Sequence, residues 1–436
     1  MINPRVEAVR ILTKFEKNAT FSSISLTDEI RAKQFSDSRD TSLTVSLVYG
    51  VLEHKLTLDY NIREYLSNKK NKLKPEILNI LRVGSYQILY MDKIPVSAAV
   101  NEAVKSSKLL GFSFAAGLVN AVLRKISLNG IVLPQDTDKT KFLSIKYSVN
   151  EDIVRVFVDN FGIDKTISVL EAFVGRRPIY IRRNSLKCFE EQLIQEFNIE
   201  NVSVEKTKLD DCYAVEHTGD IAELETFKKG LFYVQDMSSQ LCCRLLDAKP
   251  GETVVDCCAA PGGKSFTLSQ YMKNSGTLYS CDLYEHKTEL IRKSASRLGI
   301  DIINVICSDA RNLNENGIVA DRVLCDVPCS GFGVIGRKPE IRYKSYDEVS
   351  DLPNIQKEIL YSCSKMVKPG GILVYSTCTL NKEENDMVCD SFLADNPDFS
   401  VDCSGEYGAL TDRYLTILPD KESGDGFFIA KFIRGL

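Results

Sequence analysis

The sequence lacks any long apolar run. No stretch of about twenty residues, the length that a membrane-spanning helix needs, is apolar and uncharged throughout. The first residues, Met1-Ile2-Asn3-Pro4-Arg5, contain no apolar signal segment. We therefore expect neither a membrane span nor export, and the expected location is the cytoplasm.

Histidine is scarce, and the cysteines lack the spacing of common metal sites. The chain has 3 histidines, and none of its 14 cysteines belongs to a Cys-x-x-Cys pair. Zinc sites usually draw on these residue types at such spacings, so we expect no metal site. The cysteines lie within and beside apolar runs, which is typical of free buried thiols in a reducing compartment.

What is present is typical of an ordinary globular protein. Hydrophobic residues make up 44% of the 436 residues and charged residues 26%, without an internal repeat or a low-complexity tract. A chain of this length exceeds the size at which one hydrophobic core stops growing. We therefore expect two or three domains.

The charge is distributed unevenly along the chain. Residues 1–130 contain 19 Lys and Arg against 12 Asp and Glu, an excess of seven positive charges, whereas residues 131–436 carry a net charge of −11. Four lysines gather in the basic part, namely Lys69, Lys70, Lys72 and Lys74. Such a cluster suits a phosphate backbone, but on charge alone a solvated helical surface is equally well supported.

The hydrophobic pattern changes twice. Up to about residue 127 apolar residues recur at helical spacing, and a polar, turn-rich stretch follows at 129–138. From about residue 140 a helical stretch leads into short apolar strands, and from about residue 236 strands alternate with helices as in a parallel α/β sheet. The predicted strands are 179–182, 202–205, 231–234, 253–255, 277–280, 304–306, 322–325, 371–375 and 426–432.

This pattern predicts a multidomain protein of three parts. An all-α domain is predicted at 1–130. A helical linker and a small α+β unit are predicted at 140–235. An α/β domain with a doubly wound sheet is predicted at 236–436.

Aspartates follow four of the predicted strands of the last domain: Asp256, Asp282, Asp309 and Asp326. In a doubly wound sheet, ligands bind beyond the carboxyl ends of the strands. Asp282 lies 19 residues beyond Gly263, the separation that brings a second-strand acid to a ribose diol. These acids are therefore candidate ligand contacts.

The first of these strands runs into a turn of small residues: Cys258, Ala259, Ala260, Pro261, Gly262, Gly263 and Lys264. Glycines let a backbone approach a ligand closely, and N–H groups are available at the start of the next helix. Cys258 stands where a phosphate loop needs its first glycine, and a Gly-x-Gly-x-x-Gly fingerprint is absent. The pattern favours a nucleoside ligand such as S-adenosyl-L-methionine over a tight turn without a ligand.

Cys329 and Cys378 follow two neighbouring predicted strands, so both can face one pocket. Cytosine C5 is a poor nucleophile until a thiolate adds to C6, and the resulting enamine can attack an electrophilic methyl group. A single cysteine is more often a small buried hydrophobic residue. Because Asp326 lies three residues before Cys329, the combination favours chemistry.

Several segments carry a family resemblance: Asp256 to Ser265, Asp326 to Gly333, and Ser376-Thr377-Cys378-Thr379 followed by Asn381, Glu383, Glu384 and Asn385. They resemble the RNA cytosine-C5 methyltransferases. Residues 94–104 and 117–125 resemble NusB, a helical RNA-binding antitermination factor. A NusB-like domain joined to such a catalytic domain is similar to the Sun/Fmu family of bacterial 16S ribosomal RNA cytosine-C5 methyltransferases. The resemblance covers nearly the whole chain and implies a Rossmann-like, class I, S-adenosylmethionine-dependent methyltransferase domain at 236–436.

The resemblance also implies catalytic roles. The family nucleophile is the cysteine of the Thr-Cys motif, which maps to Cys378. Cys329 is then the second cysteine, which assists release of the methylated RNA. Asp326 is expected to hydrogen-bond the base near N3 or the amino group of the cofactor.

The cofactor contacts that the family implies fall on the same strand ends. The cofactor loop maps to Cys258 through Lys264, the ribose-binding acid to Asp282 and the adenine-contacting acid to Asp309. Two positions depart from the expected pattern, because Cys257 and Val327 stand where leucine and alanine are expected. Both changes are apolar and leave the assignment intact.

Three other functions stay open at this stage. A transfer RNA cytosine-C5 methyltransferase would need the same chemistry, and a non-enzymatic RNA-binding ribosome assembly factor would use the NusB-like part alone. A P-loop ATPase is suggested by Gly263-Lys264-Ser265, although Cys258 argues against it. The expected partner is 16S ribosomal RNA, naked or in a small-subunit assembly intermediate, and the expected oligomeric state is a monomer.

Overall fold

The computed structural model describes residues 3–17, 29–30, 35, 37–69, 72–175, 177–403, 413–420 and 424–436. Its contacts divide the chain into two compact units, Met1–Glu171 with Arg337–Tyr346, and Ala172–Gly336 with Asp347–Leu436. The division into 1–130, 140–235 and 236–436 stays a prediction. Of the lysine cluster, Lys70 lies outside the described residues.

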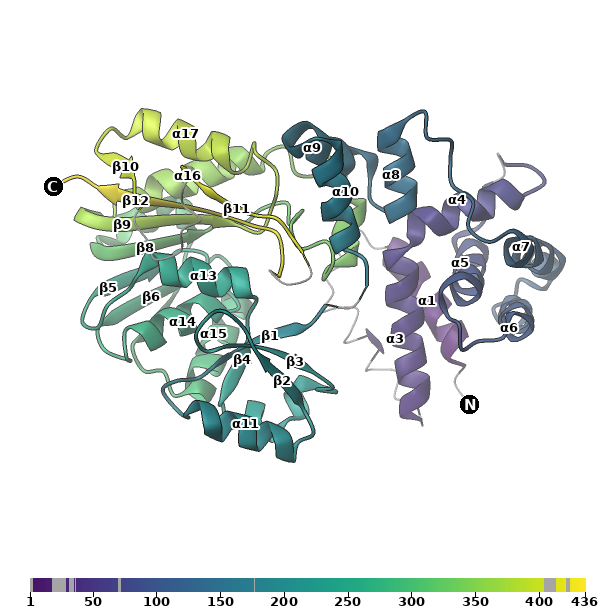
Figure 1. Ribbon diagram of the computed structural model, residues 1–436, viewed down its shortest axis with the longest axis horizontal. Coiled ribbons are helices and arrows are strands. Elements are labelled where there is room, and N and C mark those ends of the chain that lie inside the picture. Colours follow the sequence, from purple (N-terminus) through teal and green to yellow (C-terminus); the bar gives the residue numbers. More distant parts are fainter. Residues whose placement is uncertain are drawn as a thin grey trace. The chain divides into compact units, whose positions relative to one another are not determined.

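The described part of the first unit is helical (Figure 1). Its α-helices are α1 (Pro4–Lys17), α3 (Ser38–Glu53), α4 (Lys55–Tyr65), α5 (Pro75–Tyr90), α6 (Val96–Leu109), α7 (Ala116–Asn129), α8 (Lys139–Tyr147), α9 (Glu151–Phe161) and α10 (Ile163–Ala172), and its 3-10 turns are η1 (Ser113–Ala115) and η4 (Pro339–Tyr343). The all-α prediction for the N-terminal region is confirmed.

Prolines stand at two helix boundaries of this unit. Helix α5 begins at Pro75, and Pro95 is the residue that precedes α6. A proline fits the first helical turn because the N–H that it lacks would have no partner there. The apolar faces of these helices form one core, in which Leu47, Leu81 and Leu123 are fully buried.

A four-stranded antiparallel sheet opens the second unit, with strand order β2-β3-β1-β4. Its elements are β1 (Ile179–Arg183), α11 (Glu190–Ile199), β2 (Ser203–Lys206), β3 (Cys212–Glu216), η2 (Ile221–Glu223), α12 (Glu225–Lys228) and β4 (Phe232–Val234). Three of these strands match the predicted ones. Strand β3 was not predicted, and it is the strand that joins β2 to β1.

The larger sheet has the order β10-β12-β9-β8-β5-β6-β7, and β11 pairs with β12. Its strands are β5 (Thr253–Asp256), β6 (Thr277–Asp282), β7 (Ile303–Cys307), β8 (Ala320–Asp326), β9 (Val367–Thr377), β10 (Phe399–Val401), β11 (Leu415–Ile417) and β12 (Phe427–Arg434). Strands β5 to β9 are parallel, but β12 runs antiparallel to β9. The sheet is therefore mixed: its parallel part was predicted from the alternation of strands and helices, and the antiparallel direction of β12 was not.

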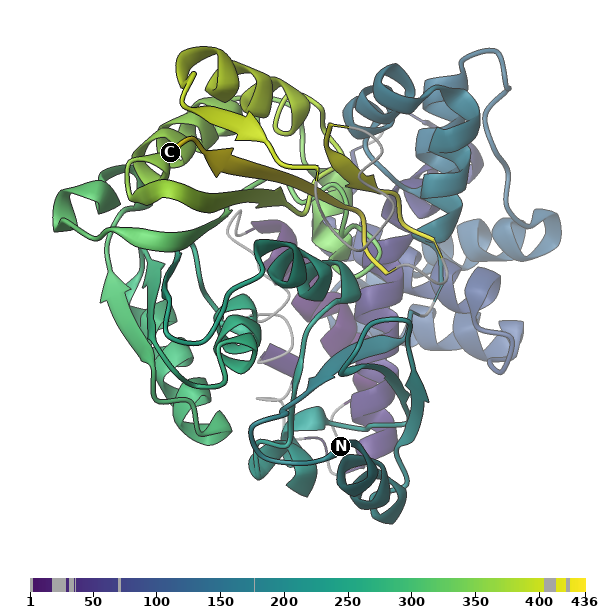
Figure 2. The same ribbon diagram turned by 60° about the vertical axis from the view of Figure 1, so that its left-hand side comes forward.

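Helices cover both faces of the larger sheet. Helices α13 (Met237–Leu246), α14 (Gly263–Tyr271) and α15 (Glu285–Leu298) pack on one face, and η3 (Ala310–Asn316), α16 (Leu352–Ser364) and α17 (Asp386–Asp395) pack on the other (Figure 1). The small sheet forms a separate layer beside α13 and α14 (Figure 2). Buried Arg182 of β1 joins these elements, donating to Gln270 Oε1 at 2.8 Å and Gln240 Oε1 at 3.2 Å.

The parallel strands bring their carboxyl ends to one edge of the sheet. Asp256, Asp282 and Asp326 are the last residues of β5, β6 and β8, and Asp309 follows β7. The predicted common edge for the four aspartates is confirmed. Among the described helices, none has the combined length and apolar character that crossing a membrane requires.

Candidate active site

The turn between β5 and α14 depends on a glycine at position 262. Gly262 has a φ of +112°, and a Cβ built there would lie 2.3 Å from the Phe266 ring. Any other residue would meet both backbone strain and a clash. The turn therefore keeps its backbone close to Phe266, and α14 begins immediately after it with free N–H groups.

Asp256 lies fully buried beneath this turn. Its Oδ2 accepts a hydrogen bond from Ser265 Oγ at 2.7 Å, and Ser280 Oγ donates to Ser265 Oγ at 2.8 Å. Burial raises the pKa of Asp256 to about 7, against the lowering effect of the Ser265 hydrogen bond, and the Asp326 charge raises it further. Asp256 thus anchors the turn from below.

A cavity of about 180 Å³ opens above the turn. It is lined by Val234, Gln235, Asp236, Ser239, Asp256, Cys258, Ala259, Ala260, Pro261, Gly263, Lys264 and Asp326. Most of the predicted loop and Asp326 therefore come together as predicted. The contribution of residues 234–239 was not predicted, because that segment reaches the cavity only through the packing of β4 and α13.

Lys264 and Asp326 form an ion pair across this cavity. Lys264 Nζ lies 2.6 Å from Asp326 Oδ2, and Ser376 Oγ donates to Asp326 Oδ1 at 2.8 Å. Burial opposes the positive charge, but the Asp326 carboxylate outweighs it and raises the pKa of Lys264 above its ordinary range. Lys264 is thus charged, and Ser376 of β9 fixes the orientation of the Asp326 side chain.

Asp282 and Asp309 lie at neighbouring strand ends, outside the lining of this cavity. Asp282 Oδ2 accepts from the backbone N–H of Ala260 at 3.3 Å, which joins the acid to the turn. Asp309 directly precedes η3 and caps it, and hydrogen bonds from Arg311 lower the pKa of Asp309. Both carboxylates are thereby held as hydrogen-bond acceptors.

The two predicted cysteines face each other. Cys329 Sγ and Cys378 Sγ lie 3.1 Å apart, and both residues are partly exposed. Cys378 follows β9, and Cys329 lies in the segment after β8, which is hydrogen-bonded to the same strand end through Gly333 N and Cys378 O at 2.9 Å. The hydrogen bond with Cys378 and burial raise the pKa of Cys329, so Cys329 stays a neutral thiol.

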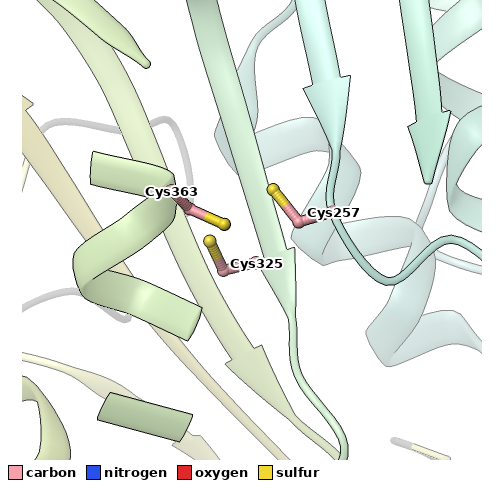
Figure 3. Close-up of side chains that lie close together, drawn as sticks. All are labelled: Cys257, Cys325 and Cys363. Atoms are coloured by element: carbon pink, nitrogen blue, oxygen red, sulfur yellow. The ribbon is translucent and has the colours of Figure 1, made fainter. Parts of the chain in front are cut away.

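A second group of thiols lies inside the second unit, where Cys257, Cys325 and Cys363 point their sulfur atoms toward one another (Figure 3). The three sulfur atoms lie within 4.8 Å of each other and belong to the apolar core between the sheet and α16. Burial raises the pKa of Cys257 and of Cys325, whereas for Cys363 the hydrogen bonds from these two thiols outweigh burial and lower the pKa to about 5. The three side chains lie among the apolar residues between the sheet and α16 and pack as part of that core.

Two buried polar atoms at the cavity fit a ligand with polar groups. Asp256 Oδ1 and Gln235 Nε2 have no hydrogen-bond partner among the described residues, and both side chains line the cavity. A buried donor or acceptor without a partner costs free energy, which a ligand can recover. Together with Asp326 and the open turn, these hydrogen-bonding groups suit the polar amino-acid and ribose groups of S-adenosylmethionine.

Comparison with known proteins identifies the class and then the family. Residues 243–433 match the family described as "16S rRNA methyltransferase RsmB/F", and residues 2–128 match the NusB family. With its Rossmann-like fold, the second unit is an S-adenosylmethionine-dependent methyltransferase. The "Probable ribosomal RNA small subunit methyltransferase B" of Bacillus subtilis is 38% identical over 97% of this chain and 96% of its own length. The chain therefore belongs to the RsmB/F methyltransferase family and carries a NusB domain.

One further curated relative and two solved structures are also similar to this chain. The "Ribosomal RNA small subunit methyltransferase B" of Shewanella oneidensis is 28% identical over 99% of both chains. The crystal structure of PH0851 superposes with a TM-score of 0.82 at 26% identity, covering 99% of each chain. A methyltransferase homolog protein from Pyrococcus horikoshii covers 68% of this chain with a TM-score of 0.60 at 28% identity. The predicted fold class is confirmed.

Proposed function

We propose that the protein forms 5-methylcytosine in 16S ribosomal RNA through a covalent adduct between Cys378 and cytosine C6. The observation that carries this proposal is the thiol pair, with Cys329 and Cys378 at 3.1 Å on two neighbouring strand ends. S-adenosylmethionine, held by Cys258–Lys264, Asp282 and Asp309 together with Asp326, supplies the methyl group that C5 accepts. The family membership and the names of the relatives support the RNA class.

Cys378 is the nucleophile in this mechanism. Its thiolate adds to C6, the C5–C6 double bond shifts its electrons to make an enamine, and C5 becomes nucleophilic. A neutral thiol at Cys329 can donate its S–H toward the Cys378 sulfur, and a hydrogen bond to the charged form favours that form. The neighbouring thiol therefore helps to generate the attacking thiolate.

Asp326 acts on the target base or on the cofactor, and Cys329 acts when the methylated RNA is released. Asp326 supports the change of charge near N3 when the thiol adds, or binds the amino group of the cofactor. After C5 has gained the methyl group, a base removes the C5 proton and the C6–sulfur bond breaks, which returns the thiolate of Cys378. Cys329 assists this release.

The remaining parts of the chain hold the RNA in this proposal. The target edge of a cytosine is hidden in a stacked helix, so the base must be unpaired or flipped out. We assign substrate contact to the basic NusB-like domain at 1–130 and to the unit at 140–235, and catalysis to 236–436. The NusB match over 2–128 supports the first assignment.

The test is methyl transfer from labelled S-adenosylmethionine to unmodified, protein-free 16S RNA, with nucleoside analysis for 5-methylcytidine. Transfer RNA is the comparison substrate. Label in 5-methylcytidine of 16S RNA alone is the expected result. Label in transfer RNA alone keeps the chemistry and overturns the substrate.

A further outcome separates enzyme from scaffold. If neither RNA is labelled although the cofactor binds, small-subunit assembly intermediates are tested next. No transfer to those particles either would overturn the proposal in favour of a non-enzymatic RNA-binding assembly factor.

A further inference from the structure

Glu384 is a buried carboxylate between the two segments that carry the cysteines. It lies after β9, six residues beyond Cys378, and its exposed fraction is 0%. The mechanism above assigns it no role. An ionised group is buried at such a position only when its partners compensate the loss of water.

Four donors converge on its two carboxylate oxygens. Oε2 accepts from the backbone N–H of Ser330 at 2.8 Å and from Gln356 Nε2 at 3.0 Å. Oε1 accepts from Asn381 Nδ2 at 3.3 Å and from Thr379 Oγ1 at 3.4 Å. Ser330 is the residue after Cys329, and Thr379 is the residue after Cys378. One side chain therefore bonds to the immediate neighbour of each cysteine.

The arrangement suits the side chain of Glu384, which offers two acceptor oxygens. Both of its oxygens accept, whereas a glutamine side chain would turn an NH₂ group toward one pair of donors. A donor that faces another donor loses its hydrogen bond and stays desolvated, and a buried donor without a partner costs free energy. Glu384→Gln therefore keeps the volume of the side chain and breaks the contact on one of the two sides.

Two further hydrogen bonds also hold the segments that carry the cysteines, but neither replaces the contacts of Glu384. Ser330 Oγ and Thr379 Oγ1 share a hydrogen bond of 2.6 Å. Gln356 Nε2 of α16 also donates to the carbonyl of Pro328 at 3.0 Å, so the helix holds the segment from the other side. Glu384 is the group that joins Gln356, Ser330 and Thr379 into one network.

We propose that Glu384 is a positioning residue that sets the separation of the Cys329 and Cys378 thiols. It fixes the residue after each cysteine, so both sulfur atoms stay within reach of one target base. The proposal rests on the proposed function for its kinetic part. Its geometric part concerns the thiol pair alone and can be tested without RNA.

The geometric test compares Glu384→Gln with the wild-type full chain by disulfide formation. Diamide takes two electrons and two protons from two thiols, so a Cys329–Cys378 disulfide and a hydrazine derivative form. The rate of disulfide formation, followed by mass spectrometry, depends on the distance between the two thiols. Alkylation by iodoacetamide measures the reactivity of each thiol alone. We expect disulfide formation in Glu384→Gln to be slower by about tenfold, with alkylation changed much less.

The kinetic test uses 16S RNA. Glu384→Gln is expected to accumulate a protein–RNA adduct and to lower kcat by about tenfold, with the Kd for S-adenosylhomocysteine within about twofold of wild type. Glu289→Gln on α15 is the matched control, because it neutralises an exposed carboxylate whose partner, Arg292, is also on the surface. The control is expected to behave as wild type.

The outcomes separate the inference from the proposed function. Wild-type disulfide and turnover rates in Glu384→Gln would overturn the positioning role. If the wild-type protein methylates no RNA, the proposed function fails, and the disulfide comparison still decides the positioning role. If Glu384→Gln does not fold, Gln356→Met decides, because it removes one donor and the Pro328 contact. Unchanged disulfide formation in Gln356→Met would overturn the proposal.

Discussion

Cys378 and Cys329 have different surroundings although their sulfur atoms lie 3.1 Å apart. Cys378 follows the buried Thr377 at the end of β9, and its carbonyl oxygen holds Gly333 of the opposite segment. We predict that Cys378→Ala lowers methyl transfer by ~1000-fold or more, because it removes the thiolate that adds to C6. The measurement is labelled methyl transfer together with calorimetric cofactor binding, which is expected to stay at wild-type affinity. Substantial retained turnover would rule out Cys378 as the nucleophile.

Cys329→Ala is predicted to separate attack from release. The nucleophile is still present in this variant, so the adduct forms, but the thiol that assists release is missing. A protein–RNA complex that survives a denaturing gel should accumulate. The control is the double variant with Cys378→Ala, in which the band should disappear because no adduct can form. Absence of the band in Cys329→Ala alone would argue against the release role.

Sequence patterns at this scale identify residues whose place follows from a recognisable strand. Asp256, Asp282 and Asp326 could be predicted because parallel strands end at a common edge. Gln356 and Glu384 could not be paired, because no strand pattern places them and only the packing of α16 brings them together. The same holds for Gln235, which reaches the cavity from the end of β4.

At the scale of elements, the β5–α14 turn carries a buried acid whose titration affects folding. The pKa of Asp256 is raised to about 7 by burial, above that of an exposed aspartate. Between about pH 4 and pH 7 the folded state therefore holds a proton that the unfolded chain has lost, so this group lowers stability as pH rises through that window. Above about pH 7 the contribution levels off.

We predict that Asp256→Asn flattens this dependence. The free energy of unfolding of the variant, relative to wild type, should rise by up to about 1.4 kcal/mol per pH unit between pH 4 and pH 7. Urea titrations at closely spaced pH values measure it in the absence of cofactor. Asp309→Asn is a useful comparison, because the pKa of Asp309 is lowered by Arg311 and the relative stability should then fall as pH rises through its acidic window. If the free energies of unfolding of Asp256→Asn and wild type change with pH in parallel, the pKa of Asp256 is not raised in the folded state.

Strand length alone did not decide which strands could be predicted. Strands β10 and β11 have three residues each, but so does β4, which was predicted. Strand β3 has five residues and pairs with both β1 and β2, so its place in the sheet depends on these neighbours. The antiparallel direction of β12 depends on the side from which the chain enters the sheet, and no local sequence pattern indicates it.

At the scale of the whole molecule, the charge asymmetry divides the chain into a basic and an acidic part. Residues 1–130 carry seven excess positive charges, and residues 131–436 a net charge of −11. Lys72 and Lys74 are exposed between α4 and α5, and Lys74 lies over the Phe112 ring at 5.6 Å from its centre. Exposed lysines of this kind offer phosphate contacts to RNA.

We predict that the double variant Lys72→Glu and Lys74→Glu weakens binding of 16S RNA and lowers its salt dependence. Each lost phosphate contact removes about 0.7 to 0.9 from the slope of log affinity against log salt, so the slope should fall by about 1.5. Binding isotherms at several potassium chloride concentrations measure it. The matched control is Lys293→Glu with Lys357→Glu, which changes the net charge equally at exposed lysines of the acidic part. If both double variants lose the same affinity, net charge alone accounts for the effect; a loss confined to Lys72 and Lys74 assigns the RNA contact to the NusB-like domain.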